Sequence, residues 1–184
     1  MLKKLCVFVF VLLTGIMTQT VKAATVNLTP STYGQWNTFD VDSSFAISGG
    51  LEWIDANGEP LAFKFTLTTP TYLKIVDGGF AGDVFEIFDN GLSLGLTSGA
   101  SNSYPNSLST NFDAAFANLN YSQRIFLLGV GTHEVTGRLT SSALDDTSQA
   151  LNATVGAVSL MPEPSTIILF LTGGAAAWFG HRKA

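Results

Sequence analysis

Residues 83–97 read DVFEIFDNGLSLGLT and contain two runs in which apolar and polar side chains alternate. In the first run Phe85 and Ile87 share one face, and in the second run leucine recurs at 92, 94 and 96. A period of two is typical of a β-strand with one buried face. Asn90-Gly91 separates the runs, and this pair accepts the positive φ angles of a type I′ turn. The stretch therefore predicts an antiparallel hairpin.

Strand-like patterns recur on both sides of this hairpin, at residues 36–41, 61–67, 72–77, 124–130, 133–139 and 152–160. We expect residues 124–130 and 133–139 to form a second hairpin that turns near Gly131-Thr132. Helix is scarce, since only residues 111–119 could form two turns, with Asn111 as the cap. A Ser/Asn-rich loop is expected at residues 97–110.

Many short strands without βαβ alternation predict an antiparallel β-sandwich, jelly-roll-like or Ig-like, over residues 24–160. A parallel sheet is not expected, because the helical crossovers it needs are missing. The strand patterns also select the side chains that should face the core. These are Phe63, Phe65, Leu73, Ile75, Phe85, Ile87, Leu94 and Leu127.

Composition limits the function of this region. Residues 24–160 contain every acidic residue of the chain except Glu163, which makes 13, but only four basic residues. Such an acidic domain is a poor candidate for binding nucleic acid or anionic lipid. The single cysteine, Cys6, lies outside it, so neither disulfides nor thiol chemistry are expected in the domain.

The N-terminal residues 1–23 have the features of a secretory signal peptide. Lys3 and Lys4 precede an apolar run, and Val21-Lys22-Ala23 ends in a small residue of the kind that signal peptidase accepts. We expect cleavage after Ala23, with Ala24 as the second choice. The run is too short for a first transmembrane helix.

The C-terminal residues predict a membrane anchor. From Pro164 to Gly180 there are 17 residues without a charge, followed by Arg182 and Lys183. As a helix this run would extend roughly 25 Å, a little less than a hydrocarbon core. Basic residues directly after such a run are expected to stay on the cytoplasmic side of the membrane.

Before the anchor stands Pro162-Glu163-Pro164, in which two prolines hold the backbone extended and accessible. The motif, the short Gly/Ala-rich apolar run and the basic end resemble the PEP-CTERM sorting signal, here residues 161–184. The resemblance implies recognition and removal of the tail by an exosortase, a membrane enzyme, on the way to the cell envelope or an exopolysaccharide matrix. A GPI signal is the competing interpretation, but the basic end counts against it.

Residues 60–140 also resemble a module of exported β-domains, including those of PEP-CTERM proteins. The hairpin region carries this resemblance, together with residues 128–133 (LGVGTH), which match a Leu-x-x-Gly-x-His strand start. The resemblance implies a sandwich and brings no established activity.

Catalytic motifs are not found. His133 is the only histidine between residues 24 and 160, and no Gly-x-Ser-x-Gly elbow accompanies it. A zinc site cannot be assembled from so few His and Cys ligands. We expect His133 to bond a backbone carbonyl, and the protein not to be an enzyme. A secreted hydrolase of an unrecognised type is the alternative.

Asp77, Asp83 and Asp89 follow one another at six-residue spacing around a glycine-rich loop. Carboxylate and carbonyl oxygens are the ligands that calcium takes, so these residues form a candidate calcium site. The alternative is that each aspartate caps a turn, as aspartates at strand ends often do.

Aromatic side chains offer a second candidate site. They could form a stacking platform for sugars if exposed, or fill the core instead, as large apolar side chains mostly do. They are Trp36, Trp53, Tyr72, Tyr104 and Tyr121. We thus expect a non-catalytic envelope or matrix protein, with a carbohydrate-binding module of the matrix as the alternative.

Overall fold

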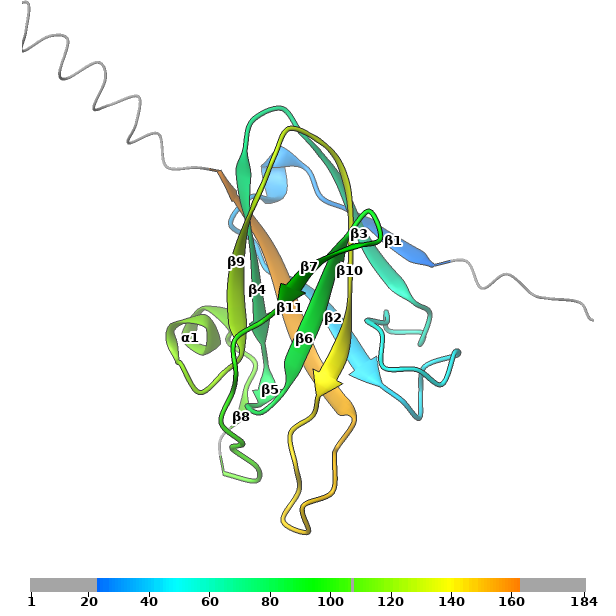
Figure 1. Ribbon diagram of the computed structural model, residues 1–184, viewed down its shortest axis with the longest axis vertical. Helices are drawn as coiled ribbons and strands as arrows, with labels where there is room; N and C mark the ends of the chain where they lie inside the picture. The colour runs from blue at the N-terminus through cyan, green and yellow to red at the C-terminus, as the bar shows by residue number, and fades with distance from the viewer. Residues whose placement is uncertain (1–22, 107, 163–184) are drawn as a thin grey trace, which may run out of the picture.

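The computed structural model describes residues 23–106 and 108–162, which form a β-sandwich-like fold of mostly antiparallel strands (Figure 1). One sheet has the strand order β1-β3-β10-β6-β7, a second has the order β2-β11-β4-β9, and β5 pairs with β8 in a small third sheet. The strands are β1 (Ala24–Asn27), β2 (Asn37–Asp42), β3 (Leu61–Leu67), β4 (Thr71–Asp77), β5 (Gly79–Phe80), β6 (Val84–Asp89), β7 (Leu92–Leu96), β8 (Leu108–Ser109), β9 (Gln123–Leu128), β10 (Gly131–Ser141) and β11 (Ala153–Pro162).

Helices contribute little: η1 (Pro30–Thr32) is a single 3₁₀ turn and α1 (Phe112–Ala117) has six residues. None of the helices in the described part of the chain is long and apolar enough to cross a membrane. Residues 1–22 of the predicted signal peptide lie outside the described residues, and so does the predicted anchor. One strand pair, β1 with β3, is parallel, which the lack of βαβ units had not led us to expect.

The core lies between the two larger sheets. Phe39 stacks on Trp53, and the ring of Phe85 meets both, edge-on, at centroid distances of 5.3 and 6.4 Å. Each of these three side chains is at most 1% exposed. Close packing of aromatic rings between two sheets stabilises a fold that has no cysteine to crosslink it.

The core prediction is confirmed for six of its eight residues, which are buried, and Leu94 packs partly buried against the same cluster. The prediction is wrong for Leu127, which is 57% exposed. In β9, Phe126 and Leu128 point to the core instead. Because residues 125–128 are all apolar, alternation could not tell the two faces of this strand apart.

The hairpin predicted at residues 83–97 is confirmed. β6 pairs antiparallel with β7, and both turn residues have positive φ, 50° at Asn90 and 78° at Gly91. The second predicted hairpin is wrong. β9 pairs with β4, whereas β10 pairs with β3 and β6, so the chain passes from one sheet to the other between Leu128 and Gly131.

α1 covers the outer face of the second sheet. Asn111 caps it as predicted, accepting a hydrogen bond from the Ala114 backbone at 3.1 Å, although the helix is shorter than the expected residues 111–119. Beneath it lies a second cluster of buried side chains, with Trp36, Phe112 and Phe116 packed at its margin. The buried members are Val76, Ala81, Ala115, Tyr121 and Ala157.

β11 is an inner strand of its sheet, paired with β2 on one side and β4 on the other. Val158 and Leu160 face the main core, and Ala157 faces the cluster under α1. The strand ends at Pro162, where the described chain leaves the sandwich. In Figure 1 this exit lies at the upper left, and the loop before β11 lies at the bottom.

Candidate functional site

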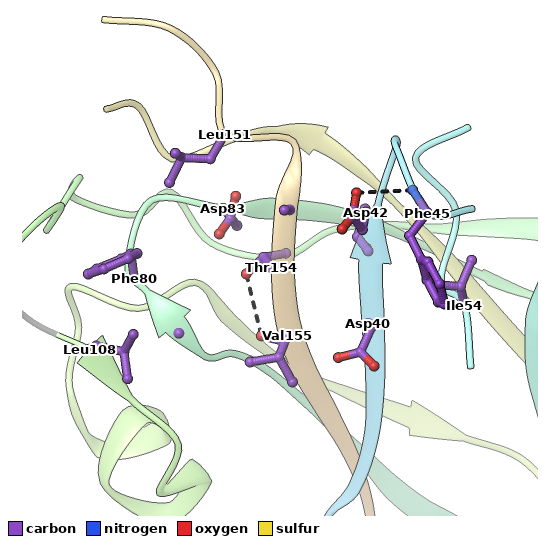
Figure 2. A pocket seen from close by; sticks show the side chains of 13 residues that line it. Asp40, Asp42, Phe45, Ile54, Phe80, Asp83, Leu108, Leu151, Thr154 and Val155 are labelled. Atoms are coloured by element: carbon purple, nitrogen blue, oxygen red, sulfur yellow. Dashed lines mark hydrogen bonds between the residues drawn. The ribbon is translucent and has the colours of Figure 1, made fainter. Parts of the chain in front are cut away.

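A cavity of about 390 Å³ lies at the end of the sandwich where β11 begins (Figure 2). β2 contributes Asp40 and Asp42 to its lining, and β5 contributes Phe80. Thr154 and Val155 of β11 run between Asp42 and Asp83 in the view of Figure 2. None of the described residues that line the cavity is Lys, Arg or His, so it offers negative charge and apolar surface but no anion partner.

Asp83, at the inner wall of this cavity, forms a buried pair with Asp77. The two residues are 1% and 0% exposed. The Asp83 backbone N–H donates to Oδ2 of Asp77 at 3.3 Å, and the hydroxyl of Thr154 donates to Oδ1 of Asp77 at 3.4 Å. Oδ1 of Asp83 accepts from the Ala143 backbone N–H at 2.9 Å. The pair thus joins the end of β4, the start of β6 and the loop before β11.

Burial strongly disfavours the charged forms of this pair. Loss of solvent, together with the smaller effect of the nearby Asp83 carboxylate, raises the pKa of Asp77 to about 9. Loss of solvent also raises the pKa of Asp83, against the hydrogen bonds from Ala143, Thr154 and Ser142 that favour its charged form. At neutral pH, Asp77 therefore carries a proton.

Gly82 makes the approach of these segments possible. Its φ is +141°, a conformation that side chains disfavour, and a Cβ there would lie 2.9 Å from Cα of Ala143. The loop before β11 can therefore reach the carboxylate of Asp83 only because residue 82 has no side chain.

The two aspartates of β2 differ from this pair. Asp42 accepts hydrogen bonds from the Ser44 hydroxyl at 2.6 Å and the Phe45 backbone at 3.2 Å. The Ser44 contacts lower the pKa of Asp42, whereas partial burial raises the pKa of Asp40. Asp42 thus caps the turn after β2. Aspartates at strand ends often have this role, which was the alternative to calcium binding predicted from the sequence.

The structure brings together only two of the three predicted calcium ligands. Asp89 lies at the opposite end of β6 from Asp83, and its carboxylate contacts Nδ1 of His133 at 2.8 Å. No cluster of three or more His, Cys, Asp or Glu side chains suited to a metal occurs among residues 23–106 and 108–162. Two buried carboxyl groups, of which Asp77 is protonated at neutral pH, do not supply the six to eight oxygen ligands that calcium takes.

His133 bonds a backbone carbonyl, as predicted, with Nε2 placed 3.0 Å from the oxygen of Gly129. Its ring also stacks on Phe65, at a centroid distance of 5.4 Å. The contact with Asp89 was not foreseen, because 44 residues separate the two in sequence. Both ring nitrogens of His133 thus have hydrogen-bond partners within the protein. His133 therefore has a structural role where the chain crosses from β9 to β10.

The five aromatic residues proposed for sugar stacking do not share one surface. Trp53 and Tyr121 are buried, in different clusters. Trp36 is half-buried, donates to Asp113 at 2.8 Å, and lies under the ammonium group of Lys74. The ring of Tyr104 contacts Phe80, a lining residue of the cavity, at 4.8 Å.

Of the predicted sorting motif, the structure describes only Pro162. This residue is exposed and pairs with Thr71 at the end of β11. Glu163, Pro164, Arg182 and Lys183 lie outside the described residues.

Sequence reasoning selected Asp77 and Asp83 but missed their partners. Ser142, Ala143 and Thr154 come from a loop and strand some 60 to 77 positions away in sequence. The glycine before Asp83 was a usable signal, because glycine is the residue that positive φ angles and close backbone approaches require, and Gly82 has a φ of 141°.

Comparison with known proteins leaves the family open. No family model matches the chain, and no curated protein matches it in sequence. Among solved structures, it is similar to a pre-peptidase C-terminal domain of a collagenase from Bacillus anthracis. The TM-score is 0.37 and the identity 8%, over 77% of this chain and 97% of that one. A likeness this distant carries no argument about function.

Proposed function

We propose that this protein is an exported, non-catalytic component of the cell envelope or of an exopolysaccharide matrix. A leader at residues 1–23 directs it out of the cell, and the segment after Pro164 anchors it in the inner membrane. An exosortase-type enzyme then reads Pro162-Glu163-Pro164 and removes or exchanges the tail. The protein binds no nucleic acid.

The observation that carries this proposal is where the sandwich ends. β11 is paired up to Pro162, and Met161 and Pro162 are exposed at the end of the sheet. A cut after Pro162 would remove none of the described core residues. The motif that resembles a sorting signal begins at Pro162, the last residue of β11.

The chemistry-bearing side chains of the described domain also support a structural role. Asp77 and Asp83 hold three segments together, and both nitrogens of His133 have hydrogen-bond partners. A general base or nucleophile needs a side chain that can reach a substrate proton or carbon. Asp77 and His133 instead contact the protein itself, and Asp83, although it lines the cavity, is only 1% exposed.

The test is the intact mass of the exported protein in a host that carries an exosortase. The expected product lacks Met1–Ala23 and the residues from about Ser165 onward. Glu163→Ala should block removal of the tail, while Asp146→Ala, which alters an exposed loop carboxylate at the other end of the domain, should leave processing unchanged. Full processing of Glu163→Ala would refute the assignment of the motif.

A second candidate function, sugar binding in the matrix, is favoured by the cavity beside β11. Its lining combines the ring of Phe80 with carboxylates of Asp40 and Asp42, which can accept hydrogen bonds from sugar hydroxyls. Because no described lining residue is basic, neutral dextran oligosaccharides should bind in preference to anionic alginate oligosaccharides. Calorimetric titration should detect that preference, and Phe80→Ala should abolish it while Leu119→Ala should not.

A further inference from the structure

Three strands of the second sheet present an apolar surface to solvent where the chain leaves the sandwich. Strand register places Met161, Tyr72 and Leu127 side by side on β11, β4 and β9. The next row consists of Ser159, Lys74 and Ile125. We define the outer apolar patch as Tyr72, Ile125, Leu127 and Met161.

The patch faces away from the core. Side chains alternate along each strand, and the neighbouring Leu160, Leu73 and Phe126 all point into the main core. Leu127 is 57% exposed, Ile125 is 49% exposed and Met161 is 37% exposed. Farther along the same face, α1 and Trp36 cover the sheet. The helix thus shields the sheet at one end and leaves the patch open at the end nearest Pro162.

The chain itself limits what can lie opposite the patch. Met161 is three positions before Pro164, where the uncharged run begins. Three residues extend at most about 11 Å. If that run enters the membrane, as the proposed function requires, the patch is held within roughly this distance of the bilayer surface.

Charge is distributed along β11 in a way that suits the same orientation. Of the six residues in the two rows nearest the exit, Lys74 is the only charged one. Asp42 pairs with Ala153 at the start of the strand, and Asp145 and Asp146 lie in the loop just before it. Ala153 and Met161 are eight residues apart, which is about 26 Å along a strand.

We propose that the outer apolar patch rests on the surface of the membrane in which the tail is anchored, with the acidic end of the sandwich pointing away. This inference rests on the proposed function, since it needs the anchor. Leu127, Ile125 and Met161 lose exposed apolar area at the lipid interface, where Tyr72 places its ring and hydroxyl at headgroup level. Lys74 keeps its ammonium group beside the aromatic rings of Trp36 and Phe116.

The test uses the protein exported by a host that lacks an exosortase, so that the tail is kept. It is recovered from membranes and reconstituted into vesicles of phosphatidylethanolamine and phosphatidylglycerol that contain a nitroxide-labelled lipid. Cys6→Ser provides a cysteine-free background. An environment-sensitive fluorophore is attached at Thr69→Cys, in the exposed loop before β4, or at Leu119→Cys, which is 84% exposed and precedes β9. We expect lipid quenching to be several-fold stronger at position 69 than at position 119.

A substitution within the patch separates contact from mere proximity. Leu127→Ser should markedly reduce quenching at position 69, and Leu92→Ser, a matched change at another exposed leucine on β7, should not. Both positions are on the surface, so neither change should unfold the domain.

Flotation of the vesicles after alkaline extraction reports on the anchor separately. If the chain floats but position 69 is not quenched, the patch does not meet the membrane and the inference is overturned while the anchor stands. If the signal at position 69 depends on protein concentration instead of on labelled lipid, a second copy covers the patch, which also overturns it. If the chain does not float, the proposed membrane anchor is wrong, and the inferred orientation of the patch is wrong with it.

Discussion

The carboxyl group of Asp77 couples the stability of the domain to pH. Its pKa is about 9 in the folded protein against an ordinary value of 3.8, because burial and the nearby Asp83 disfavour its charge. The folded state therefore keeps a proton that the unfolded chain releases between these two values. The stabilisation that this proton provides is fully present below about pH 4 and is lost as the pH rises toward 9. Over this range the free energy of unfolding falls by up to about 1.4 kcal/mol per pH unit.

Replacing Asp77 by Asn tests this coupling. The amide cannot ionise, so the free energy of unfolding of Asp77→Asn should vary less between pH 5 and pH 8 than that of the parent protein. At pH 8 the variant should be the more stable protein, by at least about 1 kcal/mol. Urea unfolding at several pH values measures both effects. Asp146→Asn, at an exposed position, should keep the steep profile, and an equally flat profile there would contradict the assignment to Asp77.

Phe85 is the residue at which the sequence prediction of the core can be tested most directly. It is fully buried, with its ring edge-on to both Phe39 and Trp53. Truncation to alanine leaves a cavity between rings that cannot easily collapse, so Phe85→Ala should cost roughly 3–5 kcal/mol. Leu92→Ala, on the neighbouring strand but 75% exposed, should change the free energy of unfolding by less than about 0.5 kcal/mol.

At the scale of elements, the approach of the loop before β11 to β6 depends on Gly82. An alanine there would adopt a disfavoured φ and press its Cβ against Ala143. Backbone strain and overpacking each cost about 1–3 kcal/mol, so Gly82→Ala should destabilise the domain by about 2–6 kcal/mol in urea unfolding. Gly99 has open space around the position of a Cβ and no positive φ, so Gly99→Ala is the matched control. Equal stability of the two variants would show that the loop can move aside.

The elements also show where sequence reasoning stops. The hairpin at residues 83–97 was predictable because a local turn, Asn90-Gly91, specifies which strands pair. The pairing of β9 with β4 was not, because it depends on contacts about 50 residues apart and because residues 125–128 are apolar on both faces. The same ambiguity placed Leu127 in the predicted core, when it belongs to the outer apolar patch.

At the scale of the whole molecule, a sandwich could be predicted from alternation and scarce helix, but the assembly of its site could not. Asp77, Asp83 and Asp89 stood out in the sequence as three evenly spaced aspartates. The burial of Asp77 and Asp83, the proton that Asp77 holds, and the separation of Asp89 at the far end of β6 follow from how the two sheets pack. A spacing of six residues places side chains along the chain and says nothing of the segments that close over them.

The whole molecule also sets the limit for removal of the tail. β11 lies between β2 and β4, and its residues 157–162 supply Val158 and Leu160 to the core and pair with β4 up to Thr71. A chain that ends at Pro162 keeps all of these contacts, so its melting temperature should lie within a few degrees of that of the protein with its tail. A chain that ends at Gly156 loses six of the ten residues of an inner strand, including the buried residues 157–160, and it should not give a cooperative transition. Circular dichroism melts of the two truncated proteins test this, and cooperative folding of the shorter one would mean that β11 is dispensable. Processing just after the motif is thus compatible with an intact sandwich, while a cut only six residues earlier is not.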